Sequence, residues 1–428
     1  MRRIIELDGI RAFAILAVIG CHYFPLSIMF FKIPEFGWAG VELFFVLSGF
    51  LITSVLLQLK TRPHPYKVFY ARRILRIFPP YYAVMLLVLL VALLQQESFS
   101  GMRYVGRALF LQAFSDASLV LHNIAQILTH ARTIPSPFHS AILPPASDRF
   151  YVTGFTASLG PTWSLSIEEW FYILWAPLVL NLRRRTLAFA CLAVCVAALF
   201  IRWFGFMGTR TYFDFFSRID VLLGGALLAL WVERRRSLSL EAKRLGDSLL
   251  LATAGIATVL LIAVLYSIRP IFGREVRESL SFTVFGLPLI ALIFAGLLSY
   301  VILHAGREHL LCRFFRLKPL VAVGTISYTL YLVHVPIYFL VNEFAGKMGV
   351  DPRAYSAALV ISLVSISLSL GVAQLSYKFY ETPIMNFKDA LTDRVTGGSS
   401  VVRSNREEFV HAPVEVDDSN TETTTANS

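Results

Sequence analysis

Residues 38–59 read WAGVELFFVLSGFLITSVLLQL, a run of 22 residues in which Glu42 is the single ionisable side chain. The hydrocarbon core of a bilayer is about 30 Å thick, and an α-helix of about 20 apolar residues crosses it. The run is followed by Lys60, the first of six Lys and Arg residues between positions 60 and 76. The stretch therefore predicts a transmembrane helix that ends beside a basic loop.

The whole chain shares the composition of this stretch. Of its 428 residues, 56% are hydrophobic and 16% are charged, whereas about 25% of the residues of a typical soluble domain are charged. This composition excludes an ordinary water-soluble enzyme, and it excludes disorder over the bulk of the chain. The four cysteines have neither the spacing of a zinc site nor the density of a disulfide scaffold. No metal and no permanently bound cofactor are therefore expected.

Similar apolar runs recur along the chain and predict an all-α polytopic membrane protein with about ten transmembrane helices. The candidate spans cover approximately residues 10–30, 38–59, 80–94, 163–180, 186–204, 219–232, 248–266, 282–303, 320–341 and 354–377. The third and the sixth are shorter than the usual lower limit of about 17 residues.

The distribution of Lys and Arg predicts that both termini are cytoplasmic, because cytoplasmic loops retain positive charge. With the N-terminus inside, the inner segments hold 23 Lys and Arg residues and the outer loops hold 11, although one outer loop is by far the longest. The net charge of +11 is thus mainly a topology signal. No nucleic-acid partner is expected.

Two segments lie outside the predicted spans. Residues 96–162 form a long extracytoplasmic loop, in which apolar patches at 108–114 and 118–128 are candidates for short re-entrant or interfacial helices. Residues 386–428 are polar and nearly free of aromatic residues, which predicts a disordered cytoplasmic tail. The transmembrane domain is expected to occupy residues 1–385.

The first predicted span carries Arg11 and His22. Ionisable side chains within a bilayer are functional candidates, because their burial is costly. Eleven helical residues turn through about 1100°, close to three full turns, so the two side chains share a face about 16 Å apart. This face suits a ligand with an anionic head at Arg11 and a reactive end at His22, whose imidazole is a candidate general base. Alternatively, Arg11 is a positive-inside anchor and His22 is an interhelical hydrogen-bonding residue.

Two further candidates flank the second span. Glu42, near its outer end, is a candidate catalytic residue that orients or stabilises a histidine, the alternative being an interfacial acid in contact with water. Arg73 and Arg76 lie one helical turn apart in the basic loop and are suited to bind phosphates. The alternative for the two arginines is contact with anionic lipid.

A third group of polar residues is a candidate acceptor-binding or structural cluster. Its members are Ser48, Glu168, Glu169, Arg218, Asp220, Tyr331 and His334. Ser48 and Gly49 should let another backbone approach closely. At least one of Glu168 and Glu169 should face a cavity or a basic partner, because both open an apolar helix. For Tyr331 and His334 the alternative is interhelical hydrogen bonding.

Eight blocks, taken in order along the chain, resemble those of the membrane-bound acyltransferase-3 family. They are LDGIR at 7–11, His22, GVELFFVLSGFLI at 40–52, RRILRIFPP at 72–80, WSLSIEEWFY at 163–172, RIDVLLGG at 218–225, GTISYTLYLVHVP at 324–336 and YKFYETP at 377–383. The resemblance covers nearly the whole chain up to about residue 385. It implies a multi-pass enzyme of the bacterial inner membrane that uses cytoplasmic acyl-CoA, with acetyl as the expected group, to O-acylate carbohydrates such as lipopolysaccharide, capsule or exopolysaccharide.

The resemblance also assigns roles to particular residues. The family's Arg-x10-His pair falls on Arg11 and His22, and its Arg-x-x-Arg motif falls on Arg73 and Arg76. The chain departs from the family at two positions, which hold Glu42 in place of the usual Asp and Trp170 in place of the usual Gln. Some relatives carry an additional SGNH hydrolase-like domain, for which the residues after the last span are too few and too polar.

These observations lead to a mechanistic hypothesis. Acyl-CoA enters from the cytoplasm with its phosphates on Arg11, Arg73 and Arg76, and His22 either removes a proton from an acceptor hydroxyl or briefly carries the acyl group. The expected partners are acyl-CoA, a carbohydrate or glycolipid acceptor and membrane lipid, with glycan-assembly proteins as a further candidate.

Two other functions remain open at this stage. A transporter could export a glycan or a small organic acid along Arg11, His22, Glu42 and Glu168. A catalytically inactive scaffold could organise a glycan-assembly complex. A transporter would move its substrate unmodified and would not bind acyl-CoA, which distinguishes it from an acyltransferase.

Overall fold

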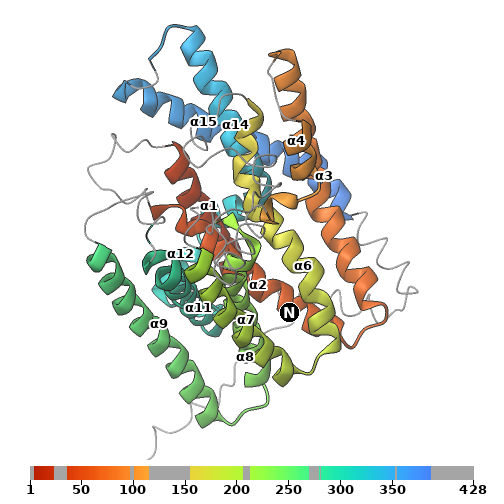
Figure 1. Ribbon diagram of the computed structural model, residues 1–428, viewed down its shortest axis with the longest axis vertical. Helices are drawn as coiled ribbons and strands as arrows, with labels where there is room; N and C mark the ends of the chain where they lie inside the picture. The colour runs from red at the N-terminus through yellow and green to blue at the C-terminus, as the bar shows by residue number, and fades with distance from the viewer. Residues whose placement is uncertain are drawn as a thin grey trace, which may run out of the picture.

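All the elements of the computed structural model are helical within the residues that it describes, which are 4–23, 36–96, 101–114, 155–205, 213–268, 279, 281–351 and 354–386. The α-helices are α1 (Ile5–Tyr23), α2 (Ala39–Leu59), α3 (Pro65–Leu94), α4 (Gly101–Ala108), α6 (Trp163–Asn181), α7 (Arg184–Gly205), α8 (Phe215–Arg235), α9 (Leu240–Ile268), α11 (Leu287–Leu303), α12 (Leu310–Phe315), α13 (Lys318–Thr325), α14 (Ser327–Lys347) and α15 (Tyr355–Ser376). Two 3-10 segments, η3 (Leu111–Phe114) and η5 (Phe155–Thr162), and two π-helical segments, η7 (Phe282–Gly286) and η8 (Tyr377–Glu381), complete the order (Figure 1). The predicted all-α class is confirmed for these residues.

Seven of the described helices are long and apolar enough to cross a membrane, and an eighth is obtained if α13 and α14, bent by 75°, count as one span. The predicted first and fourth spans correspond to α1 and α6. Neither is among the seven: α1 carries three charged residues in its first two turns, and α6 carries the adjacent acids Glu168 and Glu169. A total of about ten spans, and the cytoplasmic location of both ends, stay predictions.

The two spans that looked short in the sequence belong to longer helices. α3 has 30 residues and begins at Pro65, whereas its apolar run covers only residues 80–94. Proline is favoured at the first position of a helix, and Lys and Arg are good helix formers, so the basic segment continues the helix. α8 likewise has 21 residues. Charged residues end an apolar run without ending the helix.

α2 and α8 pack most closely at two glycines. A Cβ on Gly49 would lie 1.8 Å from the carbonyl oxygen of Leu222, and a Cβ on Gly225 would lie 1.9 Å from that of Val46. Only glycine allows the two backbones to approach so closely. The close approach expected at Gly49 is therefore confirmed.

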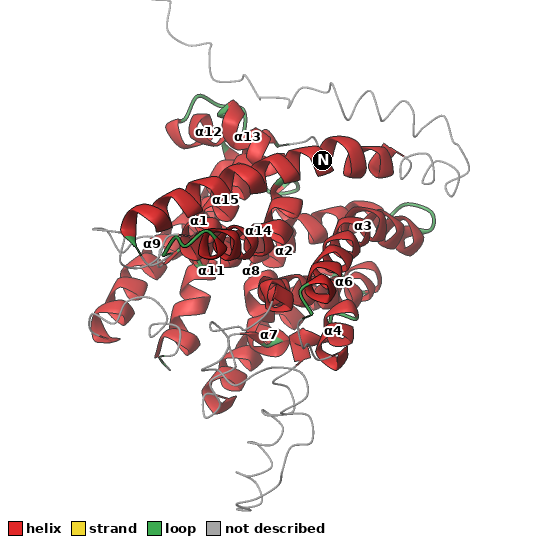
Figure 2. Ribbon diagram, turned by 90° about the horizontal axis from the view of Figure 1, so that it is seen from above, coloured by secondary structure: helices red, strands yellow, loops and turns green. Residues whose placement is uncertain are grey.

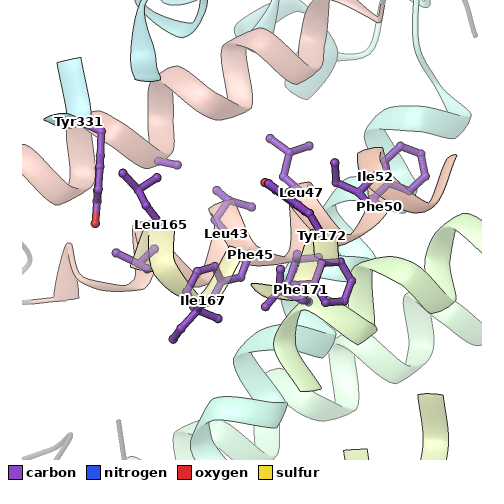
Figure 3. Close-up of a cluster of buried hydrophobic side chains, with 14 of the residues drawn as sticks. Leu43, Phe45, Leu47, Phe50, Ile52, Leu165, Ile167, Phe171, Tyr172 and Tyr331 are labelled. Carbon is purple, nitrogen blue, oxygen red and sulfur yellow. The ribbon is translucent and has the colours of Figure 1, made fainter. Parts of the chain in front are cut away.

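The apolar core continues from α2 to α6. Figure 3 shows the buried side chains that line this contact. They are Leu43, Phe45, Leu47 and Phe50 from α2, and Leu165, Ile167 and Phe171 from α6.

The outermost helices present apolar side chains to their surroundings. α3 and α9 lie on opposite sides of the bundle in both overall views (Figures 1 and 2). Leu86, Leu90 and Leu94 on α3 are exposed, as are Ile256 and Val259 on α9. A protein surrounded by water rarely exposes apolar faces of this extent. The described bundle therefore fits a lipid environment.

The predicted loop and tail lie largely outside the described residues. The patch at 118–128 and residues 387–428 are not among them, whereas η3 covers part of the patch at 108–114. Just before η3, the Phe110 ring stacks on Tyr81 of α3, with 4.5 Å between centroids. This part of the loop therefore packs against the helical bundle.

Candidate active site

Two histidines from distant parts of the sequence meet between α1 and α14. Nδ1 of His22 lies 3.0 Å from Nε2 of His334, and the two ring centroids are 5.0 Å apart. His334 is fully buried, whereas His22 is exposed. The sequence marked both residues but could not pair them. The structure thus gives the candidate base a buried imidazole partner.

Tyr23 fixes this end of α1 against α14 and α15. Its hydroxyl donates to the backbone carbonyl of His334 at 2.6 Å and lies 2.9 Å from the hydroxyl of Ser369. Its ring stacks on Tyr338, with 4.8 Å between centroids. Tyr23 is buried, so the contact holds α1 beside the backbone of its partner helix. Sequence reasoning missed this residue, because a tyrosine next to a histidine carries no distinctive pattern.

The three arginines expected to bind phosphates lie in one electrostatic cluster. Arg11 donates to the carboxylate of Asp8 at 2.6 Å, one turn earlier on α1. The positive charges of Arg73 and Arg76 on α3 repel that of Arg11. The Arg73 guanidinium also lies over the ring of Tyr172, 5.1 Å from its centroid. The arrangement brings together groups that bind phosphate oxygens well.

The adjacent acids of α6 lie near the same arginines. The Glu168 carboxylate accepts hydrogen bonds from Ser48 at 2.9 Å and from Tyr172 at 2.7 Å, and both Glu168 and Glu169 attract Arg73. The expectation that at least one acid faces a basic partner is thus confirmed. The sequence assigned Arg73 and these acids to separate clusters, whereas the structure places them in one.

Glu42 forms a buried ion pair with Arg218, which joins α2 to α8. Both side chains are fully buried, and the Arg218 guanidinium lies 5.8 Å from the centroid of the Phe45 ring. Glycine contacts between the same two helices bring the charges together. Glu42 thus pairs with Arg218, whereas the side chain observed beside His22 is His334. A catalytic role for Glu42 stays a prediction.

A second buried ion pair joins α7 to α8. Arg202 donates two hydrogen bonds to the carboxylate of Asp220, at 2.9 and 2.7 Å. Sequence reasoning missed Arg202, although a charged residue within the apolar run 186–204 was a visible signal. Asp214, just before α8, accepts hydrogen bonds from the backbone N–H groups of Phe216 and Ser217 and so caps the helix. Burial raises the pKa of Asp214 to about 6.

The remaining predicted polar residue, Tyr331, connects α14 to α6. Its hydroxyl donates to the Pro161 carbonyl at 2.9 Å and lies 2.7 Å from the hydroxyl of Ser164. Tyr331 lies one turn before His334, and its backbone carbonyl oxygen is 2.7 Å from Nδ1 of His334. The alternative of interhelical hydrogen bonding is thus confirmed for Tyr331.

The end of α15 adds an acid that the sequence had not singled out. The π-helical segment η8 ends at Glu381, whose carboxylate accepts a hydrogen bond from Thr329 at 2.6 Å. The charge of Glu381 also acts on Arg76. Its position within the YKFYETP block was the available signal. π-Helical turns often occur at functional sites.

The described side chains favour acid–base chemistry at His22. Within the residues that the structure describes, no set of three His, Cys, Asp or Glu side chains is placed to hold a metal ion. An exposed imidazole with a buried partner can accept a proton from a hydroxyl. Arg11 lies on the same helix, about 16 Å from His22 at 1.5 Å per residue. It is close to Arg73 and Arg76, whose guanidinium groups can bind anions.

The sequence matches a family model described as "Acyltransferase domain" over residues 4–372. The peptidoglycan O-acetyltransferase OatA of Listeria monocytogenes is 29% identical over 89% of this chain and 55% of its own length. The O-acetyltransferase OatA of Staphylococcus aureus is 26% identical over 88% of this chain and 56% of its own length.

The putative peptidoglycan O-acetyltransferase YrhL of Bacillus subtilis is 29% identical over 90% of this chain and 55% of its own length. The chain thus spans about half the length of the curated relatives that it matches. No solved structure matches it.

Proposed function

The chain belongs to the acyltransferase-3 family that its motifs predicted, and we propose that it is a membrane O-acetyltransferase. In this proposal it transfers an acetyl group from cytoplasmic acetyl-CoA to a hydroxyl of a carbohydrate or glycolipid. The observation that carries the proposal is the position of His22 on α1. Its exposed imidazole lies against buried His334. The same helix carries Arg11, whose charge interacts with those of Arg73 and Arg76.

His22 acts as the general base. It accepts the proton of the acceptor hydroxyl as that oxygen attacks the thioester carbonyl carbon, and the tetrahedral intermediate then releases the CoA thiolate, which takes up a proton. General-base catalysis of this kind contributes roughly 10²–10⁴ in rate. The products are an O-acetyl ester and free CoA.

Arg11, Arg73 and Arg76 bind the phosphates of acetyl-CoA. Guanidinium groups form strong, charge-assisted hydrogen bonds to phosphate oxygens. Their mutual repulsion makes an anionic ligand favourable, because bound phosphate offsets that repulsion. Since Arg11 and His22 lie on one helix, the same element positions both the anionic head of the donor and its thioester.

The proposed acceptor is a glycan. The relatives that match nearly the whole of this chain are named as O-acetyltransferases, and the names of two of them specify peptidoglycan. The hydrogen-bonded set of Ser48, Glu168 and Tyr172 beside Arg73 offers donors and acceptors suited to sugar hydroxyls. The enzyme then resides in the bacterial inner membrane, with acetyl-CoA on the cytoplasmic side.

The function is tested with the purified full-length chain in proteoliposomes. Acetyl-CoA carrying a labelled acetyl group is supplied with candidate glycans, including peptidoglycan fragments, and mass spectrometry detects ester-linked label. We expect label on the glycan and a matching release of CoA. Transport of an unmodified glycan without CoA release would instead support an exporter and would refute the proposal.

A further inference from the structure

A chain of hydrogen bonds runs from the backbone of α14 through His334 to His22. Nδ1 of His334 lies 2.7 Å from the carbonyl oxygen of Tyr331, and Nε2 of His334 lies 3.0 Å from Nδ1 of His22. A backbone carbonyl can only accept a hydrogen bond, so Nδ1 of His334 carries a proton. This assignment decides the role of the second ring nitrogen.

His334 is fully buried, and burial of an unpaired charge is costly, so its imidazole is neutral. A neutral imidazole carries one proton, which leaves a lone pair on Nε2 of His334. That lone pair accepts the proton on Nδ1 of His22. The basic nitrogen of His22 is then Nε2, on the edge of the ring directed away from His334.

We propose that His334 is a positioning residue, which holds His22 in the tautomer whose Nε2 is the general base. This inference rests on the proposed function. When Nε2 of His22 takes the proton of the acceptor hydroxyl, the resulting imidazolium keeps its Nδ1–H bond to the neutral His334. The proton later leaves from Nε2 to the departing CoA thiolate, so His22 returns to its starting tautomer.

The surroundings hold the His334 ring in the required orientation. The Tyr331 ring lies beside it, with 5.5 Å between centroids, and the Tyr331 hydroxyl is engaged by Pro161 and Ser164. Tyr23 bonds to the His334 carbonyl and places its own ring 6.2 Å from the imidazole. A 180° flip of the His334 ring would put carbon atoms in place of both nitrogens and break both imidazole hydrogen bonds.

The kinetic test compares His334→Ala with His334→Gln. Alanine removes the acceptor that fixes the His22 tautomer, so kcat should fall roughly 10–100-fold while KM for acetyl-CoA stays within about twofold. Glutamine can place its amide oxygen near the position that Nε2 of His334 occupies, so we expect His334→Gln to keep most of the wild-type kcat. His309→Ala is the matched control, because His309 also contacts a second imidazole, that of His304, but lies at an exposed position.

Equal loss in the alanine and glutamine variants, or unchanged kcat in His334→Ala, would overturn the inference. A second measurement needs no altered His334. Solid-state NMR of the wild-type protein with ¹⁵N-labelled histidine, with signals assigned through His22→Ala, should show His22 protonated at Nδ1 and unprotonated at Nε2. The opposite tautomer would contradict the inference. Absence of acetyl transfer by the wild-type protein would instead refute the proposed function itself.

Discussion

The buried pair of Glu42 and Arg218 permits a quantitative test of how α2 and α8 are held together. Both side chains are completely inaccessible to solvent, so removal of either leaves the other charge buried without this ion-pair partner. Loss of one partner from a buried ion pair typically costs about 3–5 kcal/mol, whereas replacement of both partners by apolar residues is often neutral or stabilising. The single variants Glu42→Leu and Arg218→Met should therefore each be strongly destabilised.

Thermal unfolding in detergent measures this effect. Each single variant should unfold at a temperature lower by on the order of 5–10 °C, and the double variant should return close to the wild-type value. The pair Arg235–Asp247, whose side chains are 33% and 17% exposed, is the matched control, with a coupling expected below about 1 kcal/mol. Additive losses in the Glu42 and Arg218 cycle would refute the reasoning, because they would show no coupling between the two charges.

Three other predictions follow from separate features. Gly49→Ala and Gly225→Ala should each destabilise the protein by about 1–3 kcal/mol, because the added methyl group would lie less than 2 Å from a backbone oxygen of the facing helix. Gly255→Ala is the control in the same unfolding assay and should be tolerated, because its methyl group would have no neighbouring atom within 4 Å. Arg73→Gln should raise KM for acetyl-CoA by roughly 10–100-fold through loss of one phosphate contact, and the exposed Arg313→Gln should leave it unchanged. Asp214→Ala should cost about 1 kcal/mol and Asp214→Asn less. Burial raises the pKa of Asp214 to about 6, so the folded protein binds the carboxyl proton more tightly than the unfolded chain does. The free energy of unfolding should therefore fall as the pH rises from about 4 to about 6. Asp214→Asn, which cannot titrate, should flatten that slope.

The features that the sequence predicts well are those carried by a local pattern. The apolar run at 38–59 predicts α2, and the small residue Gly49 within it predicts close helix packing. The spacing of Arg11 and His22 predicts one face of one helix. In each case the physical cause, a membrane of fixed thickness or the period of the α-helix, acts over neighbouring residues.

The features that the sequence does not predict depend on which helices touch. His334 lies 312 residues from His22, and no local pattern pairs them. Arg218 pairs with Glu42, which lies 176 residues away in the sequence. Arg202 is a visible charge within an apolar run, but its partner, Asp220, lies on the next helix, so no local pattern pairs the two. Buried ion pairs between helices become visible only once the packing is known.

Acetyl transfer by His22 variants tests the central claim most directly. Purified wild-type protein, His22→Ala and His22→Gln are compared for release of CoA and for ester-linked acetyl on the acceptor glycan, at saturating acetyl-CoA. If His22 is the general base, both variants should lose roughly 10²–10⁴ in kcat while acetyl-CoA still binds through the arginines of α1 and α3. Full activity in either variant would contradict the account.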